Sequence, residues 1–492
     1  MTGLRVVVLG LLAVLAAAVV VQGLAVRVPS DLALDYVEGF DQLDAERVAQ
    51  GGPLYGDPGE PPFTVHVYTP LYTFLVSLAL RAGAEGFAAG RILGTAAFLG
   101  TAILVIVSAR RRSGWIAWAV AALYLTTPLV GTWAALGRPD ALAVFFSAAG
   151  IVLVDRCWKS RAVYAAIPLF GLALLTKQSV AMGLLASFLY LLAQAPRRAL
   201  GLAVLTCGAG LAVVAALEWV SDGWFLFHTV TANMAPYSFA KVLELQRQFF
   251  ALHWPELAVA LFVLVAWFRE RKGSLYVLWF GCSAVATLSL GKSGSDTNHL
   301  LEALAATAFL IANAWPLQSL ARSPAWVRRL APVALVLMGV LALFNYGIQP
   351  RQNSWIEPAE SRVAEVADRL SGVPGPVISD DATILQRLRK PLLFRPFAMT
   401  QLAYAGKWDD AHVIGLLEDR EVGLVIFEAL PGHSPNRARY TAGMRDALTR
   451  NYRRVGSYQT QRPYEIYAPR GGEPPPVPKE AQGRESSASE GG

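Results

Sequence analysis

Long apolar segments recur along the first 350 residues, and they constrain the fold more than any other feature of the chain. Residues 4–26 are apolar apart from Arg5 and Gln22, a run long enough to cross a hydrocarbon core of about 30 Å. A cleaved signal peptide is the alternative, but the run exceeds a typical signal-peptide core and no convincing small-residue cleavage site precedes Arg27, so a retained helix is favoured. Further spans are predicted at 87–109, 115–134, 140–154, 199–220, 255–268, 274–290, 299–316 and 330–348, with a helical hairpin at 162–194. The sequence therefore predicts an α-helical polytopic membrane protein with about eleven transmembrane helices.

Composition agrees with this class. Hydrophobic residues make up 54% of the chain and charged residues 16%, whereas about 25% charged is usual in soluble proteins. The formal net charge of +7 could indicate nucleic-acid binding. However, the basic residues stand in twos and threes between apolar runs and form no basic face with interleaved aromatics, so no nucleic-acid partner is expected. The three cysteines are scattered, which argues against a disulfide framework or a zinc-ligand cluster.

The basic clusters also predict the topology in the cell membrane. With the N-terminus inside, the cytoplasmic loops carry Arg110–Arg112, Arg156/Lys159/Arg161, Arg197/Arg198, Arg269/Arg271/Lys272 and Arg322/Arg328/Arg329. This distribution satisfies the rule that short cytoplasmic loops are rich in Lys and Arg. The apolar run Tyr68–Leu80 is too short for a span, and counting it as one would move Arg110–Arg112 outside. We therefore predict an interfacial or re-entrant helix there.

Three regions follow from these patterns. Residues 1–350 form a transmembrane domain, in which 27–86 is the first outer loop and holds the interfacial helix. Residues 351–470 alternate amphipathic helical patterns with short apolar strands, and eleven crossings place this α/β domain outside the cell. The predicted strands lie at 376–379, 422–427 and 464–467. The tail 471–492, rich in Pro, Ser, Glu and Gly, is too polar to order itself.

Polar residues interrupt the apolar runs at positions that this topology places at the outer ends of spans. Ionisable groups in or beside a membrane are costly and by default mark a functional site. If the stretch Leu34–Phe40 after the first span is helical, the carboxylates of Asp35 and Glu38 stand three residues apart and share a face. The set comprises Asp35, Glu38, Arg138, Asp140, Lys177, Lys292, Asn298 and His299.

Two carboxylates near three cations suit one chemistry in particular. The cations would stabilise a phosphate leaving group, while a carboxylate takes the proton of an attacking hydroxyl. Because nucleotide sugars are absent outside the cell membrane, the activated donor should be lipid-borne. A polyprenyl-phosphate-linked sugar fits both the location and the cation set.

The order of these motifs resembles the GT-C superfamily of membrane glycosyltransferases, in the branch that uses polyprenyl-phosphate-linked monosaccharides. That branch includes protein O-mannosyltransferases and the lipid A aminoarabinose transferase. The resemblance covers roughly residues 1–350 and rests on Asp35-Tyr36-Val37-Glu38-Gly39, Gly51-Gly52-Pro53-Leu54-Tyr55, Tyr68-Thr69-Pro70-Leu71-Tyr72, Gly90-Arg91, Gly137-Arg138-Pro139-Asp140, Leu175-Thr176-Lys177-Gln178 and Gly291-Lys292-Ser293-Gly294.

The resemblance implies roles for these residues. Asp35 would be the catalytic base and Glu38 would orient the acceptor or tune the base, although many relatives have adjacent Asp-Glu here, which leaves the choice of base open. The implied phosphate- and substrate-binding residues are Tyr68, Arg138, Asp140, Lys177, Lys292 and His299. No metal is obviously required, since cations already neutralise the leaving group, but Asp35 and Glu38 could bind a divalent cation and the metal dependence is left open. The implied reaction is an inverting sugar transfer to an extracytoplasmic glycan, lipid or protein, with the sugar and the acceptor left open.

Other interpretations compete with this one. Arg138–Asp140 is also a normal helix start, and Lys177 could extend from a hairpin tip toward water. A transporter or flippase for a lipid-linked or anionic precursor is the alternative function. It would place polar residues at mid-span and show internal repeats, whereas this chain gathers its charges toward one face. An envelope scaffold would not explain the buried lysines.

Overall fold

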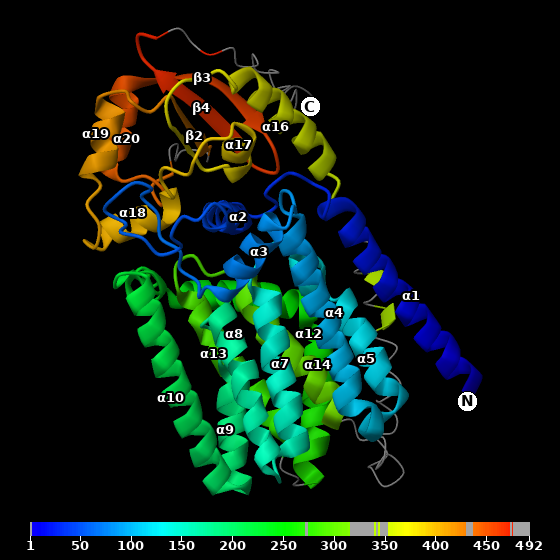
Figure 1. The fold of residues 1–492 in the computed structure, drawn as a ribbon. Coiled ribbons are helices and arrows are strands. Elements are labelled where there is room, and N and C mark those ends of the chain that lie inside the picture. The colour runs from blue at the N-terminus through cyan, green and yellow to red at the C-terminus, as the bar shows by residue number, and fades with distance from the viewer. Residues whose placement is uncertain are drawn as a thin grey trace. The chain divides into compact units, whose positions relative to one another are not determined.

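The computed structural model describes residues 2–270, 274–314, 353–429 and 436–472, together with 339–340, 343–344 and 475. These residues form two compact units (Figure 1). The first comprises Met1–Pro29, Val48–Gln50 and Val67–Asn353, and the second comprises Ser30–Arg47, Gly51–His66 and Ser354–Gly492. Segments of the predicted first outer loop thus pack with residues that follow them by more than three hundred positions.

The first unit is a helical bundle. Its α-helices are α1 (Thr2–Arg27), α3 (Leu71–Arg81), α4 (Ala88–Ser113), α5 (Trp115–Thr126), α6 (Pro128–Trp133), α7 (Asp140–Cys157), α8 (Ala166–Thr176), α9 (Met182–Gln194), α10 (Pro196–Val220), α11 (Trp224–Leu226), α12 (Phe239–Glu270), α13 (Leu275–Ala286) and α14 (Leu301–Ala314). Short 3₁₀ or π turns lie at Arg161–Ala165, Phe227–Thr231, Thr287–Gly291 and Thr297–Leu300.

Among the described residues, four helices are long and apolar enough to cross a membrane: Val7–Arg27, Ala88–Ser113, Pro196–Val220 and Phe239–Val265. Further apolar helices of 10–17 residues accompany them, among them Trp115–Thr126 and Met182–Gln194. The bundle packs around α14, which is buried from Leu301 to Ala312. In contrast, α10 buries only Ala199 and Leu202 among its residues, so its apolar surface suits hydrocarbon rather than water.

Several predicted spans have different boundaries. The run at 255–268 belongs to the 32-residue helix α12, which begins at Phe239 and contains Pro255. Polar residues such as Lys241 and Glu244 hide its first half from a hydropathy scan. The predicted span 115–134 is divided at Thr127, because Pro128 starts a new helix in the position that proline favours. The predicted helix at 68–80 is the short α3, and the predicted span 330–348 lies almost entirely outside the described residues.

The second unit combines α2 (Tyr36–Ala49) with a four-stranded mixed sheet and flanking helices (Figure 1). The sheet order is β1-β2-β4-β3, with β1 parallel to β2 and the other pairs antiparallel. The elements are β1 (Val377–Ser379), β2 (Leu424–Glu428), β3 (Tyr452–Gln459), β4 (Pro463–Pro469), α16 (Ile356–Leu370), α17 (Ala382–Arg387), α18 (Pro396–Tyr404), α19 (Ala411–Glu418) and α20 (Ala442–Asn451). The three predicted strands are β1, β2 and β4. The fourth, β3, was not predicted because its half-polar sequence suits an edge strand rather than a buried one.

Candidate functional site

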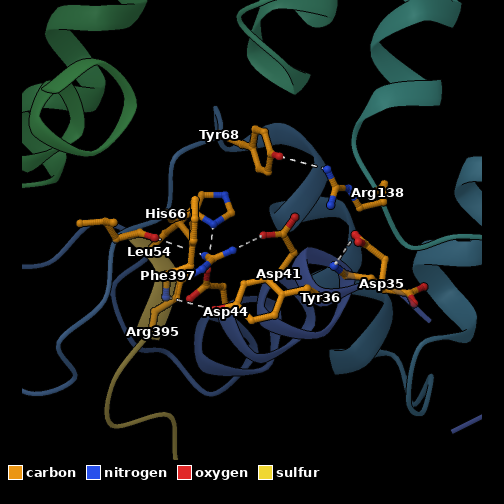
Figure 2. Close-up of polar contacts among 12 residues, drawn as sticks. Asp35, Tyr36, Asp41, Asp44, Leu54, His66, Tyr68, Arg138, Arg395 and Phe397 are labelled. Atoms are coloured by element: carbon orange, nitrogen blue, oxygen red, sulfur yellow. Dashed lines mark hydrogen bonds and ion pairs between the residues drawn. The ribbon is translucent and has the colours of Figure 1, made fainter. Parts of the chain in front are cut away.

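The acidic stretch starts helix α2 in the second unit (Figure 2). Asp35 stands immediately before the helix, and its Oδ1 accepts a hydrogen bond from the Glu38 backbone N–H at 3.3 Å. Its carbonyl accepts the first helical bond, from the Gly39 N–H. Asp35 is therefore the N-cap residue of α2, where Asp is strongly preferred. Its side chain is half-buried and lines a surface pocket of the unit.

Glu38 has a different environment from Asp35. It is 1% exposed, and its Oε2 accepts a hydrogen bond from the Leu34 N–H at 2.7 Å. Together the two residues form a variant of the capping box, in which the N-cap side chain and the third helical residue each satisfy a backbone donor. The sequence predicts a shared helix face for the two carboxylates if Asp35 is helical. Asp35 instead precedes the helix, so the two carboxylates do not share an exposed helix face.

Buried ion pairs fix α2 to the C-terminal part of the second unit (Figure 2). The Arg395 guanidinium donates to Asp41 Oδ1 and to Asp44 Oδ2, both at 3.1 Å. His66 Nδ1 lies 2.9 Å from the same Asp44 Oδ2, and Arg47 Nη2 donates to Asp44 Oδ1 at 2.8 Å. Burial acts to raise the pKa of Asp44, but Arg47, the bond with His66, and Arg395 hold it well below its usual range. None of these residues was singled out from the sequence, because the pairs join positions far apart in the chain.

Among the described residues, Asp41, Asp44 and His66 also form a group whose ligand atoms are close enough to hold a metal ion. The Arg395 guanidinium already bonds both carboxylates. A cation would have to displace it, so these residues fit a structural ion-pair cluster better than a metal centre. Asp35 and Glu38, the sequence-predicted cation ligands, serve as a helix cap instead, and a cation there remains a prediction.

A second cluster lies in the first unit, around Asp140 at the start of α7. The Lys177 ammonium bonds Asp140 Oδ1, and Arg138 Nε lies 3.6 Å from Asp140 Oδ2. Asn298 Nδ2 donates to Asp140 Oδ1 at 2.9 Å. Arg138, Asp140 and Lys177 are each at most 5% exposed. Two buried cations thus share one carboxylate, which leaves the group with positive charge.

Tyr68 joins the same cluster. Arg138 Nη2 donates to the Tyr68 hydroxyl at 3.2 Å (Figure 2), and the Lys177 ammonium lies 5.5 Å from the centre of the Tyr68 ring. The guanidinium of Arg138 also lies 5.5 Å from the Trp133 ring. Aromatic faces at these distances attract cations electrostatically and hold both side chains in place.

Glycines on α4 allow the loop that carries Arg138 to approach the bundle. A methyl group at Gly90 would come within 3.1 Å of the Gly137 Cα, and one at Gly94 within 2.9 Å of the Leu136 carbonyl oxygen. Both contacts are with backbone, which cannot swing aside. The sequence motifs Gly90-Arg91 and Gly137-Arg138 therefore meet in the structure.

Lys292 follows the last turn after α13, and its ammonium bonds Asn233 Oδ1. Burial, with repulsion from Lys177, lowers the pKa of Lys292 to about 8. The loop is held by backbone bonds from Ser238 N to Gly291 O and from Ser293 N to Pro236 O, both 2.8 Å. Asn233 was missed at the sequence level because a single Asn in an irregular segment carries no pattern.

A cavity of about 30 Å³ lies behind the cluster and is lined by Asp140, Lys177, Asn298 and His299. Glu302, in the first turn of α14, lines it too. Its Oε1 accepts hydrogen bonds from Ser147 Oγ (3.2 Å), Gly183 N (3.0 Å) and Trp279 Nε1 (3.1 Å). Glu302 was missed, although a lone acid inside a predicted span should have been a signal.

Six of the eight predicted site residues, Tyr68, Arg138, Asp140, Lys177, Lys292 and His299, thus lie in the first unit, while Asp35 and Glu38 lie in the second. Among them, Arg138 and Lys177 each contact both Tyr68 and Asp140. His299 shares the cavity with Asp140 and Lys177.

Comparison with known proteins adds to this geometry. Residues 67–221 match the family model described as dolichyl-phosphate-mannose-protein mannosyltransferase. A search of curated protein sequences gave no match. Among solved structures, ArnT from Cupriavidus metallidurans bound to undecaprenyl phosphate is similar with a TM-score of 0.63 and 15% identity, covering 92% of this chain and 97% of that one.

The oligosaccharyltransferase of Archaeoglobus fulgidus in its apo form is similar with a TM-score of 0.56 and 12% identity, over 96% of this chain and 75% of that one. The same organism's AglB, in complex with an inhibitory peptide and a dolichol-phosphate, gives 0.53 and 13%, over 94% and 74%. The chain shares the fold of these proteins, and part of it matches the mannosyltransferase family model, in agreement with the resemblance to GT-C membrane glycosyltransferases predicted from the sequence.

Proposed function

We propose that this protein transfers a monosaccharide from a polyprenyl-phosphate-linked donor to an extracytoplasmic acceptor, with inversion at the anomeric carbon. The observation that carries the proposal is the buried cluster in which Arg138 and Lys177 share the single carboxylate of Asp140. Buried charges are costly unless they are paired. A site with more cations than anions is therefore suited to an anionic ligand, and a lipid phosphate is available at a membrane.

The comparisons support a lipid-phosphate donor. One similar structure, ArnT, is bound to undecaprenyl phosphate, and another contains a dolichol-phosphate. The matching family model is named for a dolichyl-phosphate-mannose-protein mannosyltransferase. These names favour a transferase over a transporter or flippase for this chain, since the family model is named for a mannosyltransferase and AglB for an oligosaccharyltransferase.

The leaving group would be stabilised by the first unit. Arg138 and Lys177 provide fixed positive charges that stabilise the departing phosphate, and Lys292 provides a third. Asp140 pairs with both in the absence of donor and so keeps their side chains oriented. Asn298 in turn holds Asp140 at 2.9 Å. Preorganised charges of this kind need no reorganisation when the phosphate ester breaks.

The second unit would supply the base. The acceptor hydroxyl oxygen attacks the anomeric carbon, the bond from that carbon to the phosphate oxygen breaks, and polyprenyl phosphate leaves as the anion. The hydroxyl proton goes to Asp35. Asp35 is favoured over Glu38 because Glu38 is buried and bonded to the Leu34 N–H, whereas Asp35 lines a pocket.

Paired substitutions test the proposal. Purified protein in nanodiscs would be given short-chain polyprenyl-phosphate hexoses and pentoses, with release of polyprenyl phosphate and formation of product as the readout. Asp35→Asn should lower transfer by about 10²–10⁴-fold, the usual contribution of a general base. Glu38→Gln should cost much less, because a Gln oxygen can still accept the Leu34 N–H.

Asp31→Asn is the matched control, since the Asp31 side chain is 67% exposed and lies just upstream of the cap. It should leave transfer unchanged. Transfer by Asp35→Asn within threefold of the wild type would exclude Asp35 as the base. Movement of the intact lipid-linked sugar across a vesicle membrane without cleavage would favour the transporter instead.

A further inference from the structure

The second unit contains a pocket of about 70 Å³ that the proposed function does not yet use. One wall is the segment Leu32–Tyr36, which includes Asp35. The other walls are the connection Asp380–Thr383 after β1, the turn Thr460–Arg462 between β3 and β4, and the rings of Trp355 and Tyr464. Such a volume holds several water molecules, so a small polar group could replace them.

The polar groups that line the pocket are mainly hydrogen-bond acceptors. Asp380 is 2% exposed. Its Oδ2 accepts from the Glu428 N–H at 3.0 Å and pairs with Arg439 at 3.1 Å. Its other oxygen, Oδ1, is buried, and the Tyr440 hydroxyl interacts with the same carboxylate.

The charge of the pocket restricts the class of ligand. Asp35, Asp380 and Asp381 bring three carboxylates to its lining. The guanidinium of Arg462 is already paired with Glu428 Oε2, at 3.0 Å. Asp380 is likewise paired with Arg439, but the lining still holds three acidic side chains and one basic one, which disfavours a phosphate or a phospholipid headgroup here. The donor substrate, which carries a phosphate, belongs with the cations of the first unit instead.

The mixture of carboxylate, hydroxyl and amide side chains in the lining fits a sugar. Carboxylates accept hydrogen bonds, and hydroxyl and amide groups both accept and donate them, so adjacent sugar hydroxyls, which also do both, suit this lining. A peptide would bring a carbonyl oxygen for nearly every N–H, and these carbonyls would face the carboxylates unfavourably. Trp355 and Tyr464 also line the pocket, and aromatic side chains of this kind combine an apolar body with a polar group.

We propose that this pocket binds the neutral, hydroxylated sugar end of a glycan acceptor and presents one of its hydroxyls to Asp35. The proposal rests on the proposed function, since it gives that function its acceptor class. It assigns the specificity for the acceptor to the second unit. The N-cap of α2 and the β3–β4 turn are then parts of one acceptor-binding site. Protein and anionic-lipid acceptors would then be poor substrates.

The experiment uses Gln461, an exposed pocket residue of the β3–β4 turn. Binding of methyl α-mannopyranoside and methyl β-glucopyranoside to the full chain in nanodiscs would be measured by saturation-transfer NMR. Gln461→Ala should weaken saccharide binding about 2–10-fold, as expected for one lost hydrogen bond. Gln461→Trp, which fills the pocket, should abolish it. Gln459→Ala, on the same hairpin but outside the pocket, is the matched control and should change nothing.

The same measurements on a Lys292→Met background separate this proposal from the proposed function. That variant should lose transfer yet bind saccharide normally, because Lys292 lies in the first unit. In the active enzyme, Gln461→Ala should raise the acceptor KM by the same factor and leave the donor KM unchanged. If neither Gln461 variant changes the affinity for saccharide, the pocket assignment would be overturned, while the proposed transferase function would be unaffected.

Three further results would also overturn it. They are preferential binding of a Ser/Thr-containing hexapeptide, saturable binding of inorganic phosphate that Gln461→Trp removes, and Ca²⁺ or Mg²⁺ binding that Gln461→Trp removes while saccharide does not bind. Saccharide binding that responds to Gln461, together with no sugar transfer by any variant, would support the pocket and contradict the proposed function.

Discussion

At the scale of single residues, Asp35 and Glu38 show how one pattern can carry two meanings. An acid followed three residues later by Glu is the signature of a capping box, and it is equally a pair of carboxylates suited to catalysis. The sequence could not divide the two roles between the residues. Both residues take part in the cap, but their environments differ: Glu38 is 1% exposed and bonded to the Leu34 N–H, while Asp35 is half-buried. This difference is the reason for proposing Asp35 as the base.

Lys292 leads to a prediction about pH. Burial and the nearby Lys177 lower its pKa to about 8, so the ammonium is charged below that pH and neutral above it. A phosphate donor binds the charged form. We therefore expect kcat/KM for the lipid-linked donor, which reports the free enzyme, to fall as pH rises through about 8.

Lys292→Arg is the informative control, because arginine stays protonated over the whole range. It should remove the fall in kcat/KM or move it above pH 10. A profile of the wild-type enzyme that is flat from pH 7 to 10 would contradict the placement of Lys292 at the phosphate.

At the scale of elements, the apolar runs in the sequence predicted most helices and the buried strands. They did not predict helices or strands that bury only one face and so alternate apolar with polar residues. The edge strand β3 and the polar first half of α12 are regular structure without an apolar run. The link between α2 and the start of α18 was also out of reach. Arg395 meets Asp41 and Asp44 across more than three hundred residues, and a single sequence contains no record of such pairs.

That link gives a stability prediction. Arg395→Met removes the guanidinium that bonds Asp41 and Asp44, while Asp44 keeps its ion pair with Arg47 at 2.8 Å. Removing one partner of a buried ion pair typically costs about 3–5 kcal/mol. For a unit of this size the midpoint of thermal unfolding should fall by roughly 6–20 °C. The loss should be measured at pH 7 by scanning calorimetry of the protein in detergent.

Two further measurements test whether the loss of stability comes from the lost ion pairs. Arg395→Lys should recover part of the loss, since it restores the charge without the two-pronged geometry. The cations depress the pKa of Asp44, so the stability they contribute is present above the pKa of the unfolded chain and is lost as pH falls through the lower folded value. A variant Arg395→Met with an unchanged midpoint would show that the cluster adds nothing.

At the scale of the whole molecule, hydropathy predicted the class and the superfamily motifs but not how the chain divides. The segments Ser30–Arg47 and Gly51–His66 follow the first span directly, yet they pack with the C-terminal residues from Ser354 onward. Hydropathy is a property of each segment alone, so it does not predict which distant segment of the chain a given segment packs against. The proposed base and the proposed phosphate cations consequently lie in separate compact units.

The predicted topology requires that the second unit face the outside, where a lipid-linked donor replaces nucleotide sugars. Basic clusters such as Arg110–Arg112 predict this orientation, because short loops rich in Lys and Arg are expected on the cytoplasmic side. Ser371 and Ser160 are both exposed, and they lie on opposite predicted sides. In a chain whose native cysteines are replaced, a membrane-impermeant maleimide should label Ser371→Cys in intact cells. Ser160→Cys should react only after permeabilisation. The reverse pattern would place Asp35 in the cytoplasm and remove the reason for a lipid-borne donor, because nucleotide sugars are available there.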